Sequence, residues 1–342
     1  MAIPTQSSVV STGLADYPTV YYDRKAFSTL YSNLWMYAAM ELRIMPNMTG
    51  VAMQIFDYTS FTANTTPATE GTPGSGQALT QNKATLNLAN YVDYISYSNK
   101  VVLTAISNVV AEGSELLGYR GALSIDTVIS NAVDTLCTTN TANDDIIVGG
   151  GGGDAPGTTA YMSAAISREA AWGLRAQNCH PKDNGLFFGI INSLNGYDLV
   201  NDASAGGTLD LQKYSDTLAP NNPALVGIKG ARVGNVGGIE WFESNALTSE
   251  TGFGSPATTA YHSYVFAKDA FAASSLGKTE LGQKNFTIKT VNFPVGSNSL
   301  DPASLIAAAS VYNVWFGTVA VPAVVAGQDR VRRIRAEASI VV

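Results

Sequence analysis

The chain has 342 residues, of which 46% are hydrophobic and 14% are charged, and its formal net charge is −7. This length can bury roughly three quarters of the unfolded surface, in one large or two modest domains, without disulfides or a structural metal. The charged fraction is about half the usual value, so we expect much of the weakly charged surface to lie in contacts. The negative net charge argues against a protein that binds nucleic acid by neutralising its phosphates.

The cysteines and the apolar runs exclude further classes of protein. Cys137 and Cys179 are too few for a disulfide framework or a four-cysteine zinc site, and we interpret them as buried thiols. The N-terminal residues lack the basic start and apolar core of a secretory signal, and no apolar run reaches the roughly 18 residues that would span a bilayer. We therefore expect a soluble protein that is made in the cytoplasm and has no membrane partner.

The N-terminal part of the chain predicts an arm, a helix and a hairpin. Residues 1–22 are rich in Ser, Thr, Pro and Tyr without periodicity, which is typical of an extended arm. Aromatic and aliphatic residues at helical spacing predict a helix over residues 23–43, stopped by Pro46. Strand-like patterns follow over residues 50–61 and 84–97. The polar segment between them, rich in Gly, Pro and Thr, predicts a long hairpin that projects from the body.

A long helix is predicted from residue 99 to about residue 136, because apolar residues recur there every three or four positions. Gly113, Gly118 and Gly121 interrupt this pattern, so we expect a kink or a break near them. The run of five glycines over residues 149–153 then predicts a flexible loop.

The rest of the chain mixes helices and strands without the regular alternation of a doubly wound sheet, which predicts the α+β class. The elements expected, in order, are a helix over 161–176, a buried strand over 185–191, a short helix over 197–200, strands at 239–244, 263–271 and 286–293, an apolar stretch over 307–325 and a basic strand over 330–342.

Residues for catalysis or metal binding are scarce. Nucleophilic catalysis usually needs a histidine base; His180 follows Cys179, but neighbours in sequence do not thereby face each other. The adjacent pair Asp144 and Asp145 fits a solvated loop better than a loosely held hard cation. A carboxylate pair of the glycosidase type stays open among 27 acidic residues. We predict no catalytic residue, no cofactor, no metal site and no enzyme.

The most concentrated charge is the basic cluster Arg330, Arg332, Arg333 and Arg335. Alternation along a strand puts Arg333 and Arg335 on one face and the other two on the opposite face. A nucleic-acid site is the weaker interpretation, since no aromatic stacking platform is interleaved with the arginines. We predict ion pairs with acidic residues of this chain or of another subunit.

The segment from Tyr22 to Val133 resembles the N4-like phage major capsid protein family. The motifs that carry the resemblance occur in the family's order: YYDRK at 21–25, TEGTPGSGQ at 69–77, NYVDYISYSN at 90–99 and the helical run over 103–133. Weaker similarities at residues 187–202 and 265–271 extend the resemblance to about two thirds of the chain.

The resemblance implies the HK97-like coat-protein fold. In that fold the chain would divide into an N-terminal arm (1–48), an extended loop (49–98), a peripheral domain with a spine helix (99–180), an axial domain (181–320) and a strand that returns to the peripheral domain (321–342). The implied function is a major capsid protein that assembles as hexamers and pentamers into an icosahedral phage head around double-stranded DNA.

The implied partners are further copies of the chain, with scaffold, portal and cement or decoration proteins, and packaged DNA only by non-specific proximity. The protein would be assembled in the host bacterial cytoplasm and reside in the virion. We predict assembly contacts at the hairpin tip, through Glu70, Gly71 and Gln77, and at Arg330, Arg332, Arg333 and Arg335. A carboxylate-dependent hydrolase and a secreted or surface adhesive protein are the alternative functions.

Overall fold

The protein is described from a computed structural model. The structure describes residues 8–9, 36–45, 50–67, 70–71, 76–105, 108–139, 145–147, 161–182, 185–202, 232–244, 246–253, 258–276, 288–292, 305–321 and 328–340.

Among the described residues, six strands form the first sheet. Its centre is the long strand β14, which pairs antiparallel with β5 on one side and with β12 and β13 on the other. At the edges β1 pairs parallel with β5, and β2 pairs parallel with β12. The bounds are β1 Ser8–Val9, β2 Glu41–Met45, β5 Ala89–Ser98, β12 Phe271–Leu276, β13 Ile288–Asn292 and β14 Ile306–Ala320.

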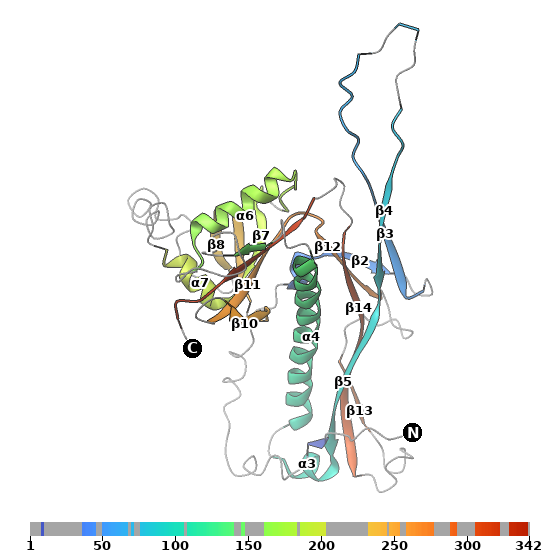
Figure 1. Ribbon diagram of the computed structural model, residues 1–342. Helices are drawn as coiled ribbons and strands as arrows, with labels where there is room; N and C mark the ends of the chain where they lie inside the picture. Colours follow the sequence, from blue (N-terminus) through green and yellow to red (C-terminus); the bar gives the residue numbers. More distant parts are fainter. Residues whose placement is uncertain are drawn as a thin grey trace.

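The second sheet has seven described strands in the order β6-β15-β11-β7-β9-β8, with β10 paired to β11. Helices α6 (Ala164–Ala176) and α7 (Ser193–Val200) pack against this sheet (Figure 1). The strand bounds are β6 Asp145–Ile147, β7 Phe187–Ile191, β8 Arg232–Val236, β9 Ile239–Glu243, β10 Ser249–Phe253, β11 Thr258–Phe266 and β15 Val331–Ala336.

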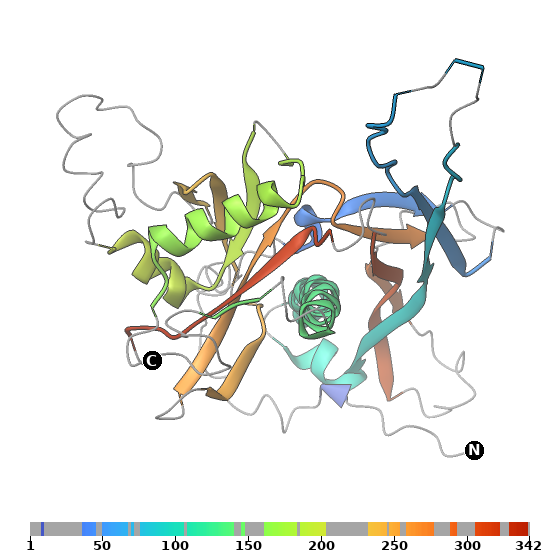
Figure 2. The same cartoon turned by 45° about the horizontal axis from the view of Figure 1, so that its top comes forward.

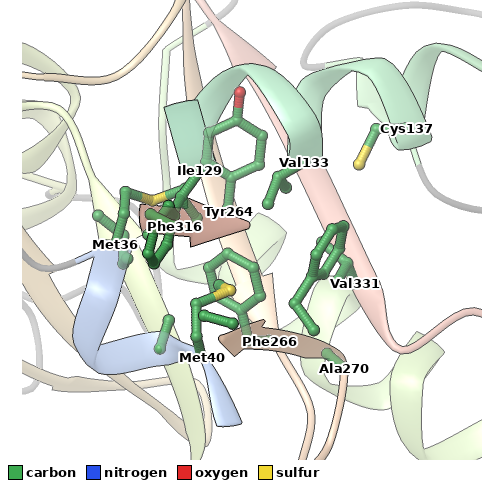
Figure 3. Packing of buried hydrophobic residues seen from close by; sticks show 14 of the residues in the cluster. Met36, Met40, Ile129, Val133, Cys137, Tyr264, Phe266, Ala270, Phe316 and Val331 are labelled. Carbon is green, nitrogen blue, oxygen red and sulfur yellow. The ribbon is translucent and has the colours of Figure 1, made fainter. Parts of the chain in front are cut away.

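The long helix α4 (Val109–Thr139) lies between the two sheets. Figure 2 shows α4 almost end-on, with strands of one sheet on each side. Its buried residues Ile129 and Val133 join a single cluster with Phe316 of the first sheet and with Tyr264 and Phe266 of the second (Figure 3). One helix therefore supplies apolar surface to both sheets.

The hairpin consists of β3 (Ala52–Tyr58) and β4 (Gln81–Asn87), which pair antiparallel beside the body, and of the loop that joins them, which projects far beyond the body (Figure 1). Only the base of the hairpin packs on the body. Ile55 and Leu86 lie in a buried cluster with Met45 and Ala272 at the β2–β12 edge of the first sheet.

The structure confirms the mixed α+β class and the projecting hairpin. The predicted strand over 84–97 is two strands, since β4 belongs to the hairpin and β5 to the first sheet. Similarly, the run over 263–271 is divided between β11 and β12, which lie in different sheets. The helix predicted over 161–176, the strand over 185–191 and the short helix at 197–200 match α6, β7 and α7.

The helix predicted over residues 23–43 is wrong at its C-terminal end. The described part contains only the short helix α2 (Met36–Ala39), and residues 41–45 form β2. Five residues of β2 pair in register with β12, from Glu41 beside Ala272 to Met45 beside Leu276. This non-local pairing overrides the local helical spacing. Residues 23–35 and the five-glycine run lie outside the described residues.

The predicted break at the glycines is also wrong, because α4 continues through all three of them. The helix is interrupted earlier, between α3 (Asn99–Thr104) and α4. Asn108 marks the new start, because its side chain accepts a hydrogen bond from the backbone N–H of Ala111 at 3.2 Å. The three glycines therefore lie within α4 and do not end it.

Gly113 is the glycine whose packing role is visible. A Cβ atom at this position would lie 2.2 Å from the hydroxyl oxygen of Tyr97, a fully buried residue of β5. That hydroxyl donates a hydrogen bond to Ser310 of β14 at 3.3 Å, and Ser310 also contacts Ser114 of α4 at 2.8 Å. The missing side chain thus lets α4 approach the first sheet.

Gly113→Ala should lower the free energy of unfolding by up to about 2 kcal/mol, because an overpacking cost of about 1 to 3 kcal/mol against Tyr97 exceeds the gain of about 1 kcal/mol in helix propensity. Urea unfolding of the unassembled chain measures the change. The double variant Gly113→Ala, Tyr97→Phe should lose less than the sum of the single variants, since the clashing oxygen is gone. Gly76→Ala is the control, because the added methyl group meets nothing within 4 Å. Strictly additive losses would contradict the proposed contact.

Candidate interaction surfaces

The outer face of the hairpin carries large hydrophobic side chains that the described part of the body leaves uncovered. Phe56 and Tyr58 are about half exposed and lie opposite Lys83 and Gln81 on this face. Further along the loop, Phe61 and Leu79 expose about 60% of their surface. A two-stranded hairpin is marginally stable by itself in water. This apolar face therefore fits a surface that another molecule covers.

The predicted tip residues lie at the far end of this hairpin. Glu70 and Gly71 form an exposed turn, and Gly71 has φ +81°, a conformation that favours glycine. Gln77 connects the two arms of the loop, because its Nε2 atom donates to the carbonyl and hydroxyl oxygens of Thr62 at 3.2 and 2.9 Å. These three residues lie far from the arginines of β15, and their role in assembly stays a prediction.

Arg330 attaches the hairpin to the body. Its Nη2 atom lies 3.1 Å from Oδ2 of Asp57 in β3, and its Nη1 atom donates to the carbonyl oxygen of Asp269 at 3.0 Å. The Arg330 side chain is 12% exposed and that of Asp57 is 30% exposed. This ion pair is largely shielded from solvent. It therefore restrains the orientation of the hairpin relative to the body more than a solvent-exposed pair would.

The other arginines follow the predicted alternation. Arg333 and Arg335 face α4 and β10, where Arg333 Nη1 lies 2.8 Å from Asp134 and Arg335 Nη1 lies 3.2 Å from Glu250. Arg332 faces the opposite side and lies against α6, since a Cβ atom at Gly173 would be 3.0 Å from its Cζ atom. The prediction of ion pairs within the chain is confirmed for Arg330, Arg333 and Arg335, and contacts between subunits stay a prediction.

Asp134 is the centre of a polar cluster between α4 and the second sheet. Its Oδ1 atom accepts from Arg333 at 2.8 Å and from the Tyr264 hydroxyl at 3.1 Å, and it lies 2.8 Å from Nδ1 of the buried His262. Burial by itself raises the pKa of Asp134, but the hydrogen bonds and charges of His262 and Arg333 outweigh it and hold the pKa well below its usual range. No local motif joins α4 to β11 and β15, so the spacing of residues along the chain did not predict this cluster.

Asp126, two turns earlier on α4, has the opposite environment. It is 1% exposed and accepts the backbone N–H of Tyr37 at 3.1 Å, at the start of α2. Its Oδ2 atom has no hydrogen-bond partner among the described residues. Burial raises the pKa of Asp126 to about 6, and the N–H groups of Tyr37 and Met36 offset only part of that effect.

Cys137 and Cys179 are both buried and form no disulfide, as predicted. Cys179 donates to the carbonyl oxygen of Asp329 at 3.4 Å, whereas His180 is exposed. Burial raises the pKa of the Cys179 thiol, which disfavours the reactive thiolate. Cys179 and His180 thus lack the arrangement of an activated nucleophile and its base.

The described part of the chain contains no group of three His, Cys, Asp or Glu side chains that could hold a metal ion. Asp144 lies outside the described residues, so the alternative of a cation at Asp144 and Asp145 stays untested. Within the same described ranges, no helix has the length and apolar character needed to cross a membrane.

Comparison with solved structures identifies proteins that share this fold. The capsid of Ralstonia phage GP4 has a chain that matches 98% of this chain and 96% of its own length, with a TM-score of 0.66 at 13% sequence identity. The capsid of cyanophage P-SCSP1u matches over 99% of both chains, with a TM-score of 0.64 at 15% identity. The mature capsid of bacteriophage PhiM1 matches 91% of this chain and 88% of its own, with a TM-score of 0.54 at 12% identity.

The chain therefore has the fold of phage capsid proteins. Neither a family model nor a curated protein matches its sequence. The shared property is the three-dimensional arrangement, which extends over nearly the whole chain in the first two comparisons.

Asp134→Asn should lower the free energy of unfolding at pH 7.5 by about 3 to 5 kcal/mol, because it leaves the buried Arg333 without its counter-charge. The lowered pKa of Asp134 means that its contribution is present above pH 4 and is lost as the pH falls further. Urea unfolding of the unassembled chain from pH 7.5 to pH 3 should show the gap to the wild type closing below about pH 4. An unchanged stability at pH 7.5 would contradict the importance of the cluster.

Asp126→Asn should act in the opposite direction and stabilise the chain at pH 7.5 by about 1 to 3 kcal/mol, because it removes a charge from a buried position. A raised pKa means that the wild type gains stability as the pH falls through 6 towards 4, so the advantage of the variant should vanish over that range. The same unfolding series measures both aspartates, and each serves as the control for the other. A variant that is less stable at every pH would show that the carboxylate itself is required.

Proposed function

We propose that this chain is the major capsid protein of a tailed bacteriophage. The observation that carries the proposal is the match to capsid chains over 96 to 99% of both partners in the first two comparisons. A hairpin with an exposed apolar face supports it independently, because such a surface needs cover from a neighbouring molecule. The protein would reside in the virion as part of the shell.

Within this proposal the elements take the roles of the HK97-like fold. Helix α4 is the spine helix, and the first sheet with α4 forms the peripheral domain. The second sheet with α6 and α7 forms the axial domain. Strand β14, from the segment expected to be axial, then belongs to the peripheral domain, since it pairs with β5. Strand β15 lies in the axial sheet, since it pairs with β11. The segment boundaries derived from the resemblance stay predictions.

The hairpin would lie over an adjacent subunit, with Glu70, Gly71 and Gln77 at its tip. Each contact made this way can be modest, because closed symmetry repeats it many times. The net charge of −7 suits a shell that holds DNA without adhering to it. We propose further copies of the chain as the main partners, and scaffold, portal and cement or decoration proteins as additional ones.

Membership of the N4-like family is the finer proposal, and it rests on the motifs between Tyr22 and Val133. A hydrolase and an adhesive protein are the competing functions. Cys179 and His180 do not support a hydrolase that uses a Cys–His pair, since the thiol is buried and hydrogen-bonded to a backbone carbonyl.

Electron microscopy of the expressed full-length chain tests the function directly. We expect hexamers, pentamers or icosahedral particles. A chain that stays monomeric at high concentration and is absent from virions would rule out the capsid function.

Replacing both outer-face aromatics, Phe56→Asp with Tyr58→Asp, should abolish particles and leave a folded, soluble chain. The buried partners Ile55 and Leu86 on the other face of the hairpin stay intact, so its base should still pack on the body. Particle counts by electron microscopy and circular dichroism of the soluble fraction measure the two effects. The conservative variant Phe56→Leu, Tyr58→Phe should still assemble. Normal particles from the charged variant would show that this face is not an assembly contact.

A further inference from the structure

An arginine and tryptophan stripe occupies the outer face of α6. Arg168, Trp172 and Arg175 lie at positions i, i+4 and i+7, which share one face of a helix. All three side chains are exposed, and Trp172, a large apolar residue, exposes 64% of its surface. Ala170 and Leu174, on the side of α6 that faces away from the stripe, are buried in the core of the second sheet. The body therefore holds the stripe in a fixed orientation.

Two side chains of the stripe also contact each other. The guanidinium carbon of Arg175 lies 5.1 Å from the centre of the Trp172 ring, within cation–π range, and 5.9 Å from that of Phe187. Arg332 of β15 adds a third guanidinium group against the same helix, near Gly173. In the part of the chain that the structure describes, neither Arg168 nor Arg175 has an acidic partner within 4.0 Å.

We propose that this α6 stripe, Arg168, Trp172 and Arg175, binds an acidic segment of a partner protein. Seven residues of helix separate the two arginines by about 10 Å along the axis. Two carboxylates three residues apart in a polyproline II segment lie on one face at a similar separation of about 9 Å, because that conformation has three residues per turn and rises about 3.1 Å per residue. An apolar side chain between them would pack on Trp172. Arginine and tryptophan are the residues most often responsible for binding energy at protein interfaces.

Charge favours a short acidic segment over a nucleic acid. Binding to a phosphate backbone needs many neutralised phosphates, whereas the chain carries a net charge of −7. Glu169 is exposed on α6 beside Arg168, which further weakens attraction for a long polyanion. Two guanidinium groups can each form a bidentate pair with one carboxylate, and that geometry suits two acidic side chains. The proposal goes beyond shell formation and does not depend on it.

A fluorescein-labelled peptide with the repeat Glu-Leu-Ala, in which the carboxylates are three residues apart, is the probe. Fluorescence anisotropy with the unassembled full-length chain should show saturable binding that weakens steeply with salt. The double variant Arg168→Ala, Arg175→Ala and the single variant Trp172→Ala should each weaken binding at least about tenfold. Arg43→Ala is the matched control, because this partly exposed arginine pairs with Glu41 on β2, away from α6.

A second pair of variants, Arg168→Lys and Arg175→Lys, keeps the charge and the fold but removes the planar fork, so binding should fall by a smaller factor. Equal binding of a matched Gln-Leu-Ala peptide, or unchanged binding by the Ala double variant, would overturn the proposal. Tighter binding of a short DNA duplex than of the peptide would overturn it as well and assign the stripe to nucleic acid. Particle formation is scored separately on each variant, so failure here is distinguishable from failure of the capsid function.

Discussion

The packing of α4 against two sheets at once is the constraint on which the rest of the structure depends. The same helix contributes Ile129, Val133 and Cys137 to a core that also contains Phe316 from one sheet and Tyr264 from the other. A helix that fills the space between two sheets fixes how they lie relative to each other, because interiors are close-packed and tolerate little displacement. The two sheets therefore share one apolar core around α4.

Polar groups between α4 and the elements packed on it restrict the relative orientations that apolar packing alone would allow. Asp134 connects α4 to β15 and β11 through Arg333, His262 and Tyr264, while Asp126 connects α4 to the start of α2. Apolar contacts are non-directional, whereas hydrogen-bonded charges accept few alternative arrangements. The packing around α4 thus combines apolar burial with a small number of oriented contacts. The hairpin is held in a related way, by an apolar base and the Arg330–Asp57 pair.

The low sequence identity to the solved capsid chains is compatible with a shared fold. Identities of 12 to 15% accompany TM-scores of 0.54 to 0.66 over nearly whole chains. Cores accept extensive apolar substitution when volume and pattern are kept. What the fold requires is a central helix with apolar faces, two sheets beside it and a long hairpin. Many sequences satisfy those requirements without a detectable common motif.

Local pattern by itself determined the elements whose residues interact mainly with near neighbours or with one apolar face. The projecting hairpin, α6 and the alternation that separates Arg332 from Arg333 and Arg335 all follow from spacing along the chain. The resemblance in the N-terminal part supplied the expected fold and function, which composition and periodicity did not contain.

Tertiary structure decided the features that depend on distant segments. Residues 41–45 became a strand because β12, more than 200 positions later, supplies their hydrogen bonds, and a local helical spacing cannot compete with that pairing. Gly113 proved to be a packing position because Tyr97 approaches it. The Asp134 cluster joins three elements far apart in sequence, so no spacing rule could reveal it. The sequence determined which faces are apolar and where charge alternates, whereas the fold decided which of those faces and charges meet.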